Sequence, residues 1–276
     1  MLAPVIEDFT EPAERLRRST VQVEGPRGGG GSGVIWRANG PVVTNAHVAR
    51  RANGRIQLAD GRVARAKVTA RDPQLDLALL EADVQDLPVA VAGDSDELRV
   101  GEIVLAAGSP YGHAGTVTVG VIHARSSRRW IEADLRLGPG NSGGPLADAR
   151  GRIVGINTMV ANGVALAIPS NIVERFVARR GKPARRLGVT VEPVNMPQFG
   201  LLIVEVEAGG AAHRAGLRVG DILTGADNRA FEAPFDLALA LEASDGVTHL
   251  DLLRGGRAVV CEVEFEPAAV VGAVVG

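Results

Sequence analysis

The chain from Ser19 to Ile168 is a succession of short β-forming runs separated by Gly, Asn and Asp. Short strands at intervals of about 8–12 residues are typical of β-sandwiches and β-barrels. No strand–helix–strand period repeats in this region, so a parallel α/β sheet is not expected. The predicted strands are Thr20–Val23, Gly33–Trp36, Val42–Thr44, Arg55–Leu58, Val63–Ala70, Leu77–Glu81, Glu102–Ala106, Thr116–His123, Ile131–Ala133, Ile153–Thr158 and Val164–Ile168.

The remainder of the chain predicts a second, mixed domain. A helix is expected to begin near Ser170 and to stop at Gly181, before Pro183. The later elements expected are strands at Leu201–Glu207 and Asp221–Thr224, helices at Ala211–Ala215 and Pro234–Ser244, and a hairpin of Thr248–Leu253 with Ala258–Phe265. We therefore expect a first domain over 15–180, a linker over 181–186, a second domain over 187–267, and tails at 1–14 and 268–276.

Composition excludes several classes of protein. The formal net charge is −2 and the basic residues are spread along the chain, whereas a nucleic-acid binder gathers them on one face. No stretch approaches 18 uninterrupted apolar residues, so no membrane span is expected. The single cysteine, Cys261, lies in an alternating apolar run and is predicted to be a buried structural thiol. The segment from Met1 to Glu14 lacks the apolar core of a secretory signal, which favours the cytoplasm, or the cell envelope if a signal was removed.

One serine stands out because small or turn-forming residues surround it. Ser142 lies in Gly140-Asn141-Ser142-Gly143-Gly144-Pro145. Glycines allow positive φ and close backbone approach, so such a loop can direct several N–H groups at one point. A serine hydroxyl becomes an effective nucleophile only when a base takes its proton and donors stabilise the oxyanion. The loop could therefore supply both the nucleophile and the oxyanion donors.

The base and its orienting carboxylate are predicted from chain order. His47 follows a predicted strand at a turn, and Asp76 lies within the apolar run 75–80, where an unpaired charge is costly. The order His47, Asp76, Ser142 on a β-rich chain is the chymotrypsin order. The same loop also fits the G-x-S-x-G elbow of α/β-hydrolases, but Pro145 and Gly151 interrupt the helix which that motif requires. We therefore reject an esterase-type fold.

The residues resemble the HtrA/Deg family of serine proteases over about Ser19 to Phe176. The matching segments are Thr44-Asn45-Ala46-His47-Val48, Asp72-Pro73-Gln74-Leu75-Asp76-Leu77-Ala78-Leu79-Leu80, Gly108-Ser109-Pro110-Tyr111-Gly112, Gly138-Pro139-Gly140-Asn141-Ser142-Gly143-Gly144-Pro145-Leu146, Gly155-Ile156-Asn157-Thr158 and Ala167-Ile168-Pro169-Ser170-Asn171. The second region resembles a PDZ domain, in the run from Ala211 to Leu223 and in a carboxylate-binding loop at Gly200, Leu201, Leu202 and Ile203.

The resemblance implies a mostly β fold, with two six-stranded chymotrypsin-like barrels followed by a small α+β PDZ domain. In it His47 is the general base, Asp76 orients it, and Ser142 attacks the scissile carbonyl. The N–H groups of Gly140 and Ser142 form the oxyanion hole. Leu137 matches the position that lines the S1 pocket, and with no acidic residue evident nearby it favours a small or medium aliphatic P1 residue.

The function implied is an ATP-independent serine endopeptidase that cleaves unfolded or damaged polypeptides. Its PDZ domain would bind peptide C-termini by strand addition, or serve only a structural or regulatory role. No metal or organic cofactor is implied. The alternative is a peptide-binding, chaperone-like module with little or no turnover. Trimers in this family rest on aromatic contacts near the N-terminus, and Phe9 and Trp36 make a trimer the expectation, with a monomer left open.

The chain departs from the family in the loops around the serine. Arg136 and Gly138 replace residues that the family often carries as Ala and Asn. The loops at Arg125–Trp130 and Val160–Gly163 are short, and the connection at Arg27–Ser32 is nearly all glycine. These are the regulatory loops of the family, so we expect simpler control here, or an active site that substrate must order.

Overall fold

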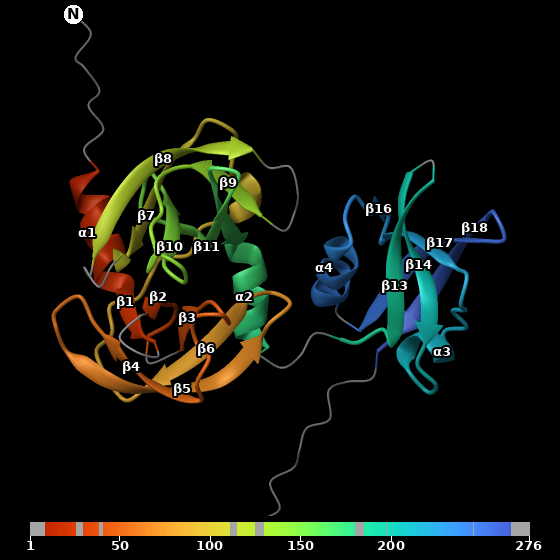
Figure 1. The fold of residues 1–276 in the computed structure, drawn as a ribbon, viewed down its shortest axis with the longest axis horizontal. Helices are drawn as coiled ribbons and strands as arrows, with labels where there is room; N and C mark the ends of the chain where they lie inside the picture. Colours follow the sequence, from red (N-terminus) through yellow and green to blue (C-terminus); the bar gives the residue numbers. More distant parts are fainter. Residues whose placement is uncertain are drawn as a thin grey trace, which may run out of the picture. The chain divides into compact units, whose positions relative to one another are not determined.

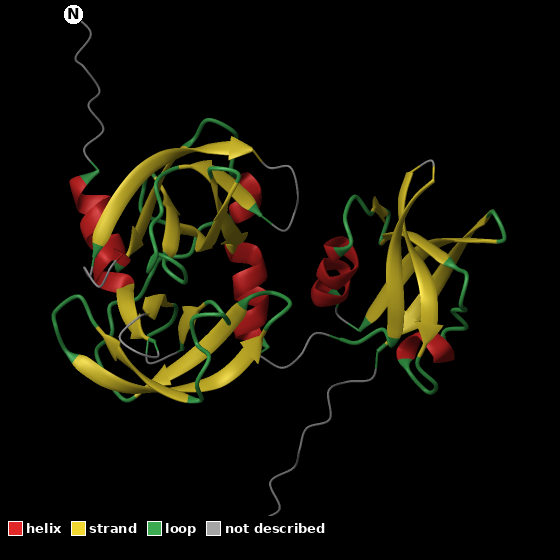
Figure 2. Cartoon of the chain, in the orientation of Figure 1, coloured by secondary structure: helices red, strands yellow, loops and turns green. Residues whose placement is uncertain are grey.

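The computed structural model describes residues 9–25, 30–38, 41–110, 115–124, 130–179, 185–196, 198–244 and 246–265. The packing of the backbone divides the chain into two compact units, Met1–Lys182 and Pro183–Gly276. Figure 2 shows that strands dominate both units. The mostly β prediction is therefore confirmed.

The first unit begins with a helix that the sequence analysis did not predict. Helix α1 spans Thr10–Ser19, so residues 10–14 are helical rather than part of a tail. Ion pairs along the helix hold its exposed side together, such as Arg15 with Glu11 at 2.6 Å. Only Leu16 and Ser19 are buried. Five of its ten residues are charged and Leu16 is its only large apolar side chain, so it lacks the recurring apolar residues by which a helix is recognised in a sequence.

Two closed six-stranded barrels follow, as predicted (Figure 1). The first has the strand order β1-β2-β3-β6-β5-β4 and the second the order β10-β11-β12-β9-β8-β7. The strands of the first barrel are β1 Thr20–Glu24, β2 Gly30–Ile35, β3 Val42–Thr44, β4 Asn53–Gln57, β5 Val63–Asp72 and β6 Leu77–Ala82. The strands of the second are β7 Ile103–Gly108, β8 Thr116–Ala124, β9 Ile131–Asp134, β10 Pro145–Asp148, β11 Ile153–Ala161 and β12 Val164–Pro169.

Each barrel is filled by its own aliphatic side chains. Alternate residues point inward, so Val21, Ile35 and Ile56 meet inside the first barrel, and Ile122 and Ile131 inside the second. Strand β10 was not predicted. It has four residues, all buried, and begins with Pro145, so it carries neither alternation nor a long apolar run.

Helix α2 and a short helix complete the first unit. The predicted helix is present as α2, Ser170–Ala178, with Phe176 fully buried. Its Glu174 accepts a 2.8 Å hydrogen bond from Trp36 Nε1, which follows β2 of the first barrel. The helix also lies against β11 and β12 of the second barrel and β6 of the first. The 3₁₀ helix η2, Ser95–Glu97, lies in the connection between the barrels. These contacts join the barrels into one unit, which fixes the loops that meet between them.

The second unit is a small α+β domain, in agreement with the prediction. Its sheet has the order β13-β14-β15-β17-β18, and β16 pairs with β15. The elements are β13 Val189–Met196, β14 Gln198–Val206, α3 Ala211–Arg214, β15 Ile222–Ala226, β16 Arg229–Ala230, α4 Phe235–Ala243, β17 Val247–Arg254 and β18 Arg257–Glu264. Strand β13 was not predicted, because Glu192, Pro193 and Asn195 interrupt its apolar pattern.

Two sequence expectations concern single features of this fold. Cys261 is half-buried rather than buried, and its thiol donates to the Ala215 carbonyl at 3.2 Å. In the part of the chain that the structure describes, no helix is long and apolar enough to cross a membrane.

Candidate active site

Paired strands bring His47 and Asp76 together. His47 lies in the turn after β3, and Asp76 directly precedes β6, which pairs with β3. His47 Nδ1 lies 2.8 Å from Asp76 Oδ2 and 3.0 Å from Oδ1. The backbone N–H of His47 also donates to Oδ1 at 3.0 Å. The carboxylate therefore holds both the ring and the backbone of the histidine, which leaves Nε2 free to act as a base.

The backbone of Asp76 is held in a conformation that few residues adopt. Its φ is +55°, in the left-handed region. Its carbonyl accepts hydrogen bonds from Ala46 N–H at 3.1 Å and from Asn45 Nδ2 at 3.0 Å. Both donors precede His47 in the same turn. The strained backbone of Asp76 is thus stabilised by the segment that carries the histidine.

A third residue, Thr158 of β11, completes the environment of this carboxylate. Its hydroxyl donates to Asp76 Oδ2 at 2.7 Å. Burial is the largest single influence on Asp76 and alone would raise its pKa. The hydrogen bonds from the His47 ring, the Thr158 hydroxyl and the His47 N–H together outweigh burial, so the pKa of Asp76 lies below its ordinary value of 3.8. Asp76 is therefore a stable carboxylate at neutral pH.

Ser142 lies in the loop between β9 and β10, on the second barrel. Its hydroxyl donates to the Thr158 carbonyl at 2.7 Å. Among the described residues, no hydrogen bond joins this hydroxyl to His47. Thr158 thus binds Ser142 through its carbonyl and Asp76 through its hydroxyl. A rotation about the Cα–Cβ bond of Ser142 would release its hydroxyl from this carbonyl.

The glycines of the serine loop are required by close backbone contacts. Gly140 has φ +103°, and a Cβ there would lie 2.4 Å from the Ser109 carbonyl oxygen. Gly143 has φ +87°, and a Cβ there would lie 2.1 Å from the Ser32 carbonyl oxygen. Within the described part of the chain, no acceptor takes the N–H of Gly140 or of Ser142. Neither predicted oxyanion donor is therefore engaged by another part of the described chain.

The predicted S1 residue, Leu137, is half-buried against the core of the second barrel. It lines a cavity of about 720 Å³ together with Val160 and Gly163. Asp134 and Arg136 also line this cavity. None of the predicted catalytic residues is among the described residues that line this cavity, so it does not test the predicted S1 pocket.

The predicted carboxylate-binding loop, Gly200–Ile203, lies inside the sheet of the second unit. Leu201 pairs with Pro193 of β13 and with Leu223 of β15, and Leu202 is likewise paired on both sides. A peptide strand cannot be added to a strand whose two edges are already bonded. The sheet order leaves the outer edge of β13 as the nearest edge. Because Leu201 and Leu202 are paired on both sides within the sheet, the structure does not support the expected carboxylate-binding loop at Gly200–Ile203.

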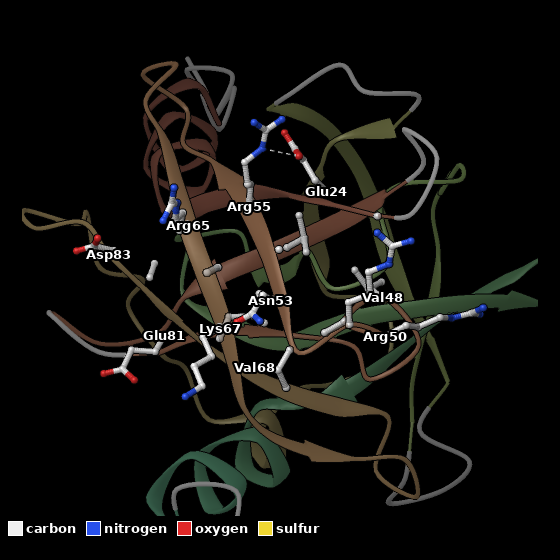
Figure 3. Close-up of a pocket in the computed structure, with 18 residues that line it drawn as sticks. Glu24, Val48, Arg50, Asn53, Arg55, Arg65, Lys67, Val68, Glu81 and Asp83 are labelled. Carbon is white, nitrogen blue, oxygen red and sulfur yellow. Dashed lines mark hydrogen bonds and ion pairs between the residues drawn. The ribbon is translucent and has the colours of Figure 1, made fainter.

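A larger cavity, of about 910 Å³, opens on the first barrel (Figure 3). Val48 and Val68 lie among its apolar lining residues. Arg50, Arg65 and Lys67 line it too, but their charged ends point in different directions (Figure 3). None of the predicted catalytic residues is among the described residues that line it. We assign this cavity no part in the chemistry.

Comparison with known proteins connects this geometry to a family. A trypsin-like peptidase domain matches residues 31–156, and a PDZ domain matches residues 202–254. A probable periplasmic serine endoprotease, DegP-like, from Pseudomonas putida strain F1 is 34% identical over 292 residues, which cover 93% of this chain and 60% of that protein. The putative serine protease HhoB from Synechocystis is 35% identical over 78% of this chain and 61% of its own length.

Solved structures agree with these relatives. The HtrA-type protease AlgW with a decapeptide superposes with a TM-score of 0.76 at 26% identity, over 95% of this chain and all of that chain. The chain belongs to the HtrA family. The serine endoprotease from Yersinia pestis superposes with a TM-score of 0.72 at 26% identity, over 96% of this chain and 98% of its own. This HtrA-family chain spans 50–61% of the length of the curated relatives that it matches.

The loops that the sequence singled out are simple where the structure describes them. Ala161 pairs with Val164, so strands β11 and β12 are joined by a turn of Asn162 and Gly163 alone. Both turn residues have positive φ, at +51° and +82°, which suits a tight hairpin. The expected loop at Arg125–Trp130 falls largely outside the described residues. Of the connection at Arg27–Ser32, residues 27–29 also fall outside them, and residues 30–32 are the first three of β2.

Proposed function

We propose that this HtrA-family chain is an ATP-independent serine endopeptidase that cleaves unfolded or damaged polypeptides. One observation carries the proposal: the 2.8 Å contact of His47 Nδ1 with an Asp76 carboxylate that is fixed from three sides. This pair lies beside a glycine loop that presents Ser142. A solvated structural ion pair would need neither the buried threonine donor nor the strained backbone of Asp76.

In the proposed mechanism, Ser142 Oγ first leaves the Thr158 carbonyl and turns to His47. Nε2 of His47 takes the hydroxyl proton as Oγ attacks the scissile carbonyl carbon. Asp76 stabilises the imidazolium that results. The N–H groups of Gly140 and Ser142 stabilise the negative oxygen of the tetrahedral intermediate.

The second half of the reaction reverses these roles. His47 gives its proton to the leaving amine, and the acyl group stays on Ser142 Oγ. Water then attacks the acyl-enzyme, with His47 again as the base. The acid product leaves, and the hydroxyl of Ser142 is restored.

The second unit is proposed to bind peptides, including polypeptide C-termini. Its topology supports strand addition at the outer edge of β13 rather than at Gly200–Ile203. Leu137, which is apolar and half-buried, supports an aliphatic P1 residue. Asp134, which is exposed, leaves a basic P1 residue as the competing outcome of a specificity screen.

The relatives also bear on compartment and assembly. The relative from Pseudomonas putida is named as periplasmic, which supports the cell-envelope alternative and lends no support to the cytoplasmic expectation. A homotrimer stays a proposal. Of the two aromatic residues offered for it, Trp36 is only 4% exposed, whereas Phe9 is half-buried and better able to contact a partner.

A casein digest tests the proposed activity. The wild-type chain, Ser142→Ala and the control Ser170→Ala are incubated with unfolded casein without ATP. Ser170 is a buried serine outside the predicted site, and its hydroxyl donates to the Gly93 carbonyl. Ser170→Ala therefore measures only the effect of removing a buried hydroxyl. We expect fragments with the wild type and Ser170→Ala and none with Ser142→Ala. Equal digestion by the wild type and Ser142→Ala overturns the proposal, and binding without cleavage favours the chaperone-like alternative.

A further inference from the structure

The hydroxyl of Ser32 links the first barrel to two loops of the second. Ser32 is on β2 and is completely buried. Its Oγ donates to the Gly140 carbonyl at 2.7 Å. The same Oγ accepts a hydrogen bond from Ser109 N–H at 2.8 Å, in the segment after β7. One side chain of the first barrel therefore bonds the residue that carries a predicted oxyanion donor.

The backbone of Ser32 holds the same loop at further points. Its N–H donates to the Ser142 carbonyl at 2.8 Å. Its carbonyl oxygen accepts a hydrogen bond from the Thr44 hydroxyl at 2.6 Å. The same oxygen would lie 2.1 Å from a Cβ at Gly143. Ser32 thus contacts the serine loop before, at and after the nucleophile. A change of side chain at Ser32 would leave these backbone contacts in place, so a variant at this position tests the hydroxyl alone.

Gly140 needs this support because glycine restrains its own backbone weakly. With no Cβ, it can rotate between widely different φ and ψ values at little cost. On one side the Ser109 carbonyl approaches its Cα so closely that a Cβ would lie 2.4 Å away. On the other side the Ser32 hydroxyl holds its carbonyl. The Ser32 hydroxyl thus fixes the peptide unit that follows the Gly140 Cα, and the Ser109 carbonyl packs against that Cα. Together they anchor the Cα from which the preceding peptide unit, which carries the Gly140 N–H, extends.

We propose that Ser32 is a positioning residue that keeps the Gly140 N–H in place as an oxyanion donor. The inference rests on the proposed peptidase function. The Ser32 hydroxyl would then help to stabilise the transition state, in addition to linking the two barrels. A buried hydroxyl that only joined the barrels would affect stability and substrate binding, without a preference for the tetrahedral state.

The test compares Ser32→Ala, Ser32→Cys and the control Ser170→Ala. Cysteine keeps nearly the size of serine but has a weak donor and a weak acceptor. An internally quenched peptide with Val at P1 gives kcat and KM separately. A peptide boronate gives the affinity for a tetrahedral adduct, and the same peptide as an amide gives the affinity for the ground state. Thermal melts show that each variant is folded.

For Ser32→Ala we expect kcat to fall about 10- to 100-fold with KM changed less than about threefold, because one oxyanion donor contributes about 10²–10³ in kcat and is here misplaced rather than removed. Boronate affinity should fall by a similar factor while amide affinity holds. Ser32→Cys should lie between Ser32→Ala and the wild type, and it carries the test if Ser32→Ala does not fold. Ser170→Ala should match the wild type in every kinetic measure.

Two outcomes overturn the inference. One is a folded Ser32→Ala or Ser32→Cys with wild-type kcat. The other is an equal loss of boronate and amide affinity, which marks a structural role only. Ser142→Ala is run in parallel, so that failure of the proposed function is recognised separately. If Ser142→Ala hydrolyses the peptide as fast as the wild type does, the proposed peptidase function is wrong, and the inference about Ser32, which rests on it, is wrong as well.

Discussion

Thr158→Val removes one hydrogen bond from the Asp76 carboxylate and leaves the rest of the site in place. The hydroxyl of Thr158 donates to Oδ2 at 2.7 Å, while its backbone carbonyl, which accepts from Ser142, is unchanged by the substitution. The Asp76 side chain is 16% exposed, so solvent replaces the lost donor poorly. Valine has almost the same shape as threonine, so the cavity effect is small.

The size of the effect follows from the type of bond. A hydrogen bond to a charged group contributes about 1.5–3 kcal/mol. Asp76 keeps the ring and backbone donors of His47, so we take the lower value. If the lost hydrogen bond raises the free energy of the transition state by its full value of about 1.5 kcal/mol, kcat/KM falls about tenfold. The pKa of Asp76 should rise, because a donor to its charged form is lost.

The assay is a double-mutant cycle on the quenched peptide with Thr158→Val, Asp76→Asn and the pair. Thr158→Val should cost about tenfold in the wild-type background and little in the Asp76→Asn background, because the hydroxyl acts through the carboxylate. Thr69→Val is the control, since the Thr69 hydroxyl makes only a 3.5 Å contact with the Leu79 carbonyl. Wild-type kcat/KM in folded Thr158→Val, or additive losses in the pair, would refute this reasoning.

Two further predictions concern stability. Gly143→Ala should lower the melting temperature more than Gly61→Ala does: both have φ +87°, but only at Gly143 does a Cβ meet backbone, 2.1 Å from Ser32 O. We expect a strain of about 1–2 kcal/mol at both sites and about 1–3 kcal/mol more at Gly143, and equal melting temperatures would contradict this. The hydrogen bonds from Arg254 hold the pKa of Asp221 below 3.8, so the stability that they give is present above pH 3.8 and is lost as the pH falls through the lower folded-state value. Melting of the second unit should therefore be acid-sensitive in the wild type and less so in Asp221→Asn, and identical pH dependence in both would contradict it.

The local pattern of apolar and polar residues was sufficient to predict most strands of the two barrels. Inward-facing Val and Ile at alternate positions are a property of single strands, so most of the strands of both barrels were predictable. The pattern failed where a strand had no alternation, as in Pro145–Asp148, or where polar residues broke it, as in Val189–Met196. It failed again in α1, where five of the ten residues are charged and only one large apolar side chain, Leu16, is buried.

The site was predictable only in part. Chain order singled out His47 and Asp76, and strand pairing brings them within 2.8 Å. The contacts of Thr158 and Ser32 depend on how two barrels meet, and no local pattern carries that information. The motif Gly155-Ile156-Asn157-Thr158 contained the threonine without indicating its partner. Which strand forms the edge of the sheet in the second unit likewise depends on strand order, which residues 200–203 alone do not reveal.

The central claim is that Ser142 is a nucleophile activated by His47. Labelling with a fluorophosphonate followed by mass spectrometry of the digested protein tests it directly, because the reagent modifies activated serines and records which one reacts. We predict a single adduct on the peptide that contains Ser142, absent in Ser142→Ala and formed far more slowly in His47→Ala. No adduct, an adduct at another residue, or equal labelling of His47→Ala would contradict the account.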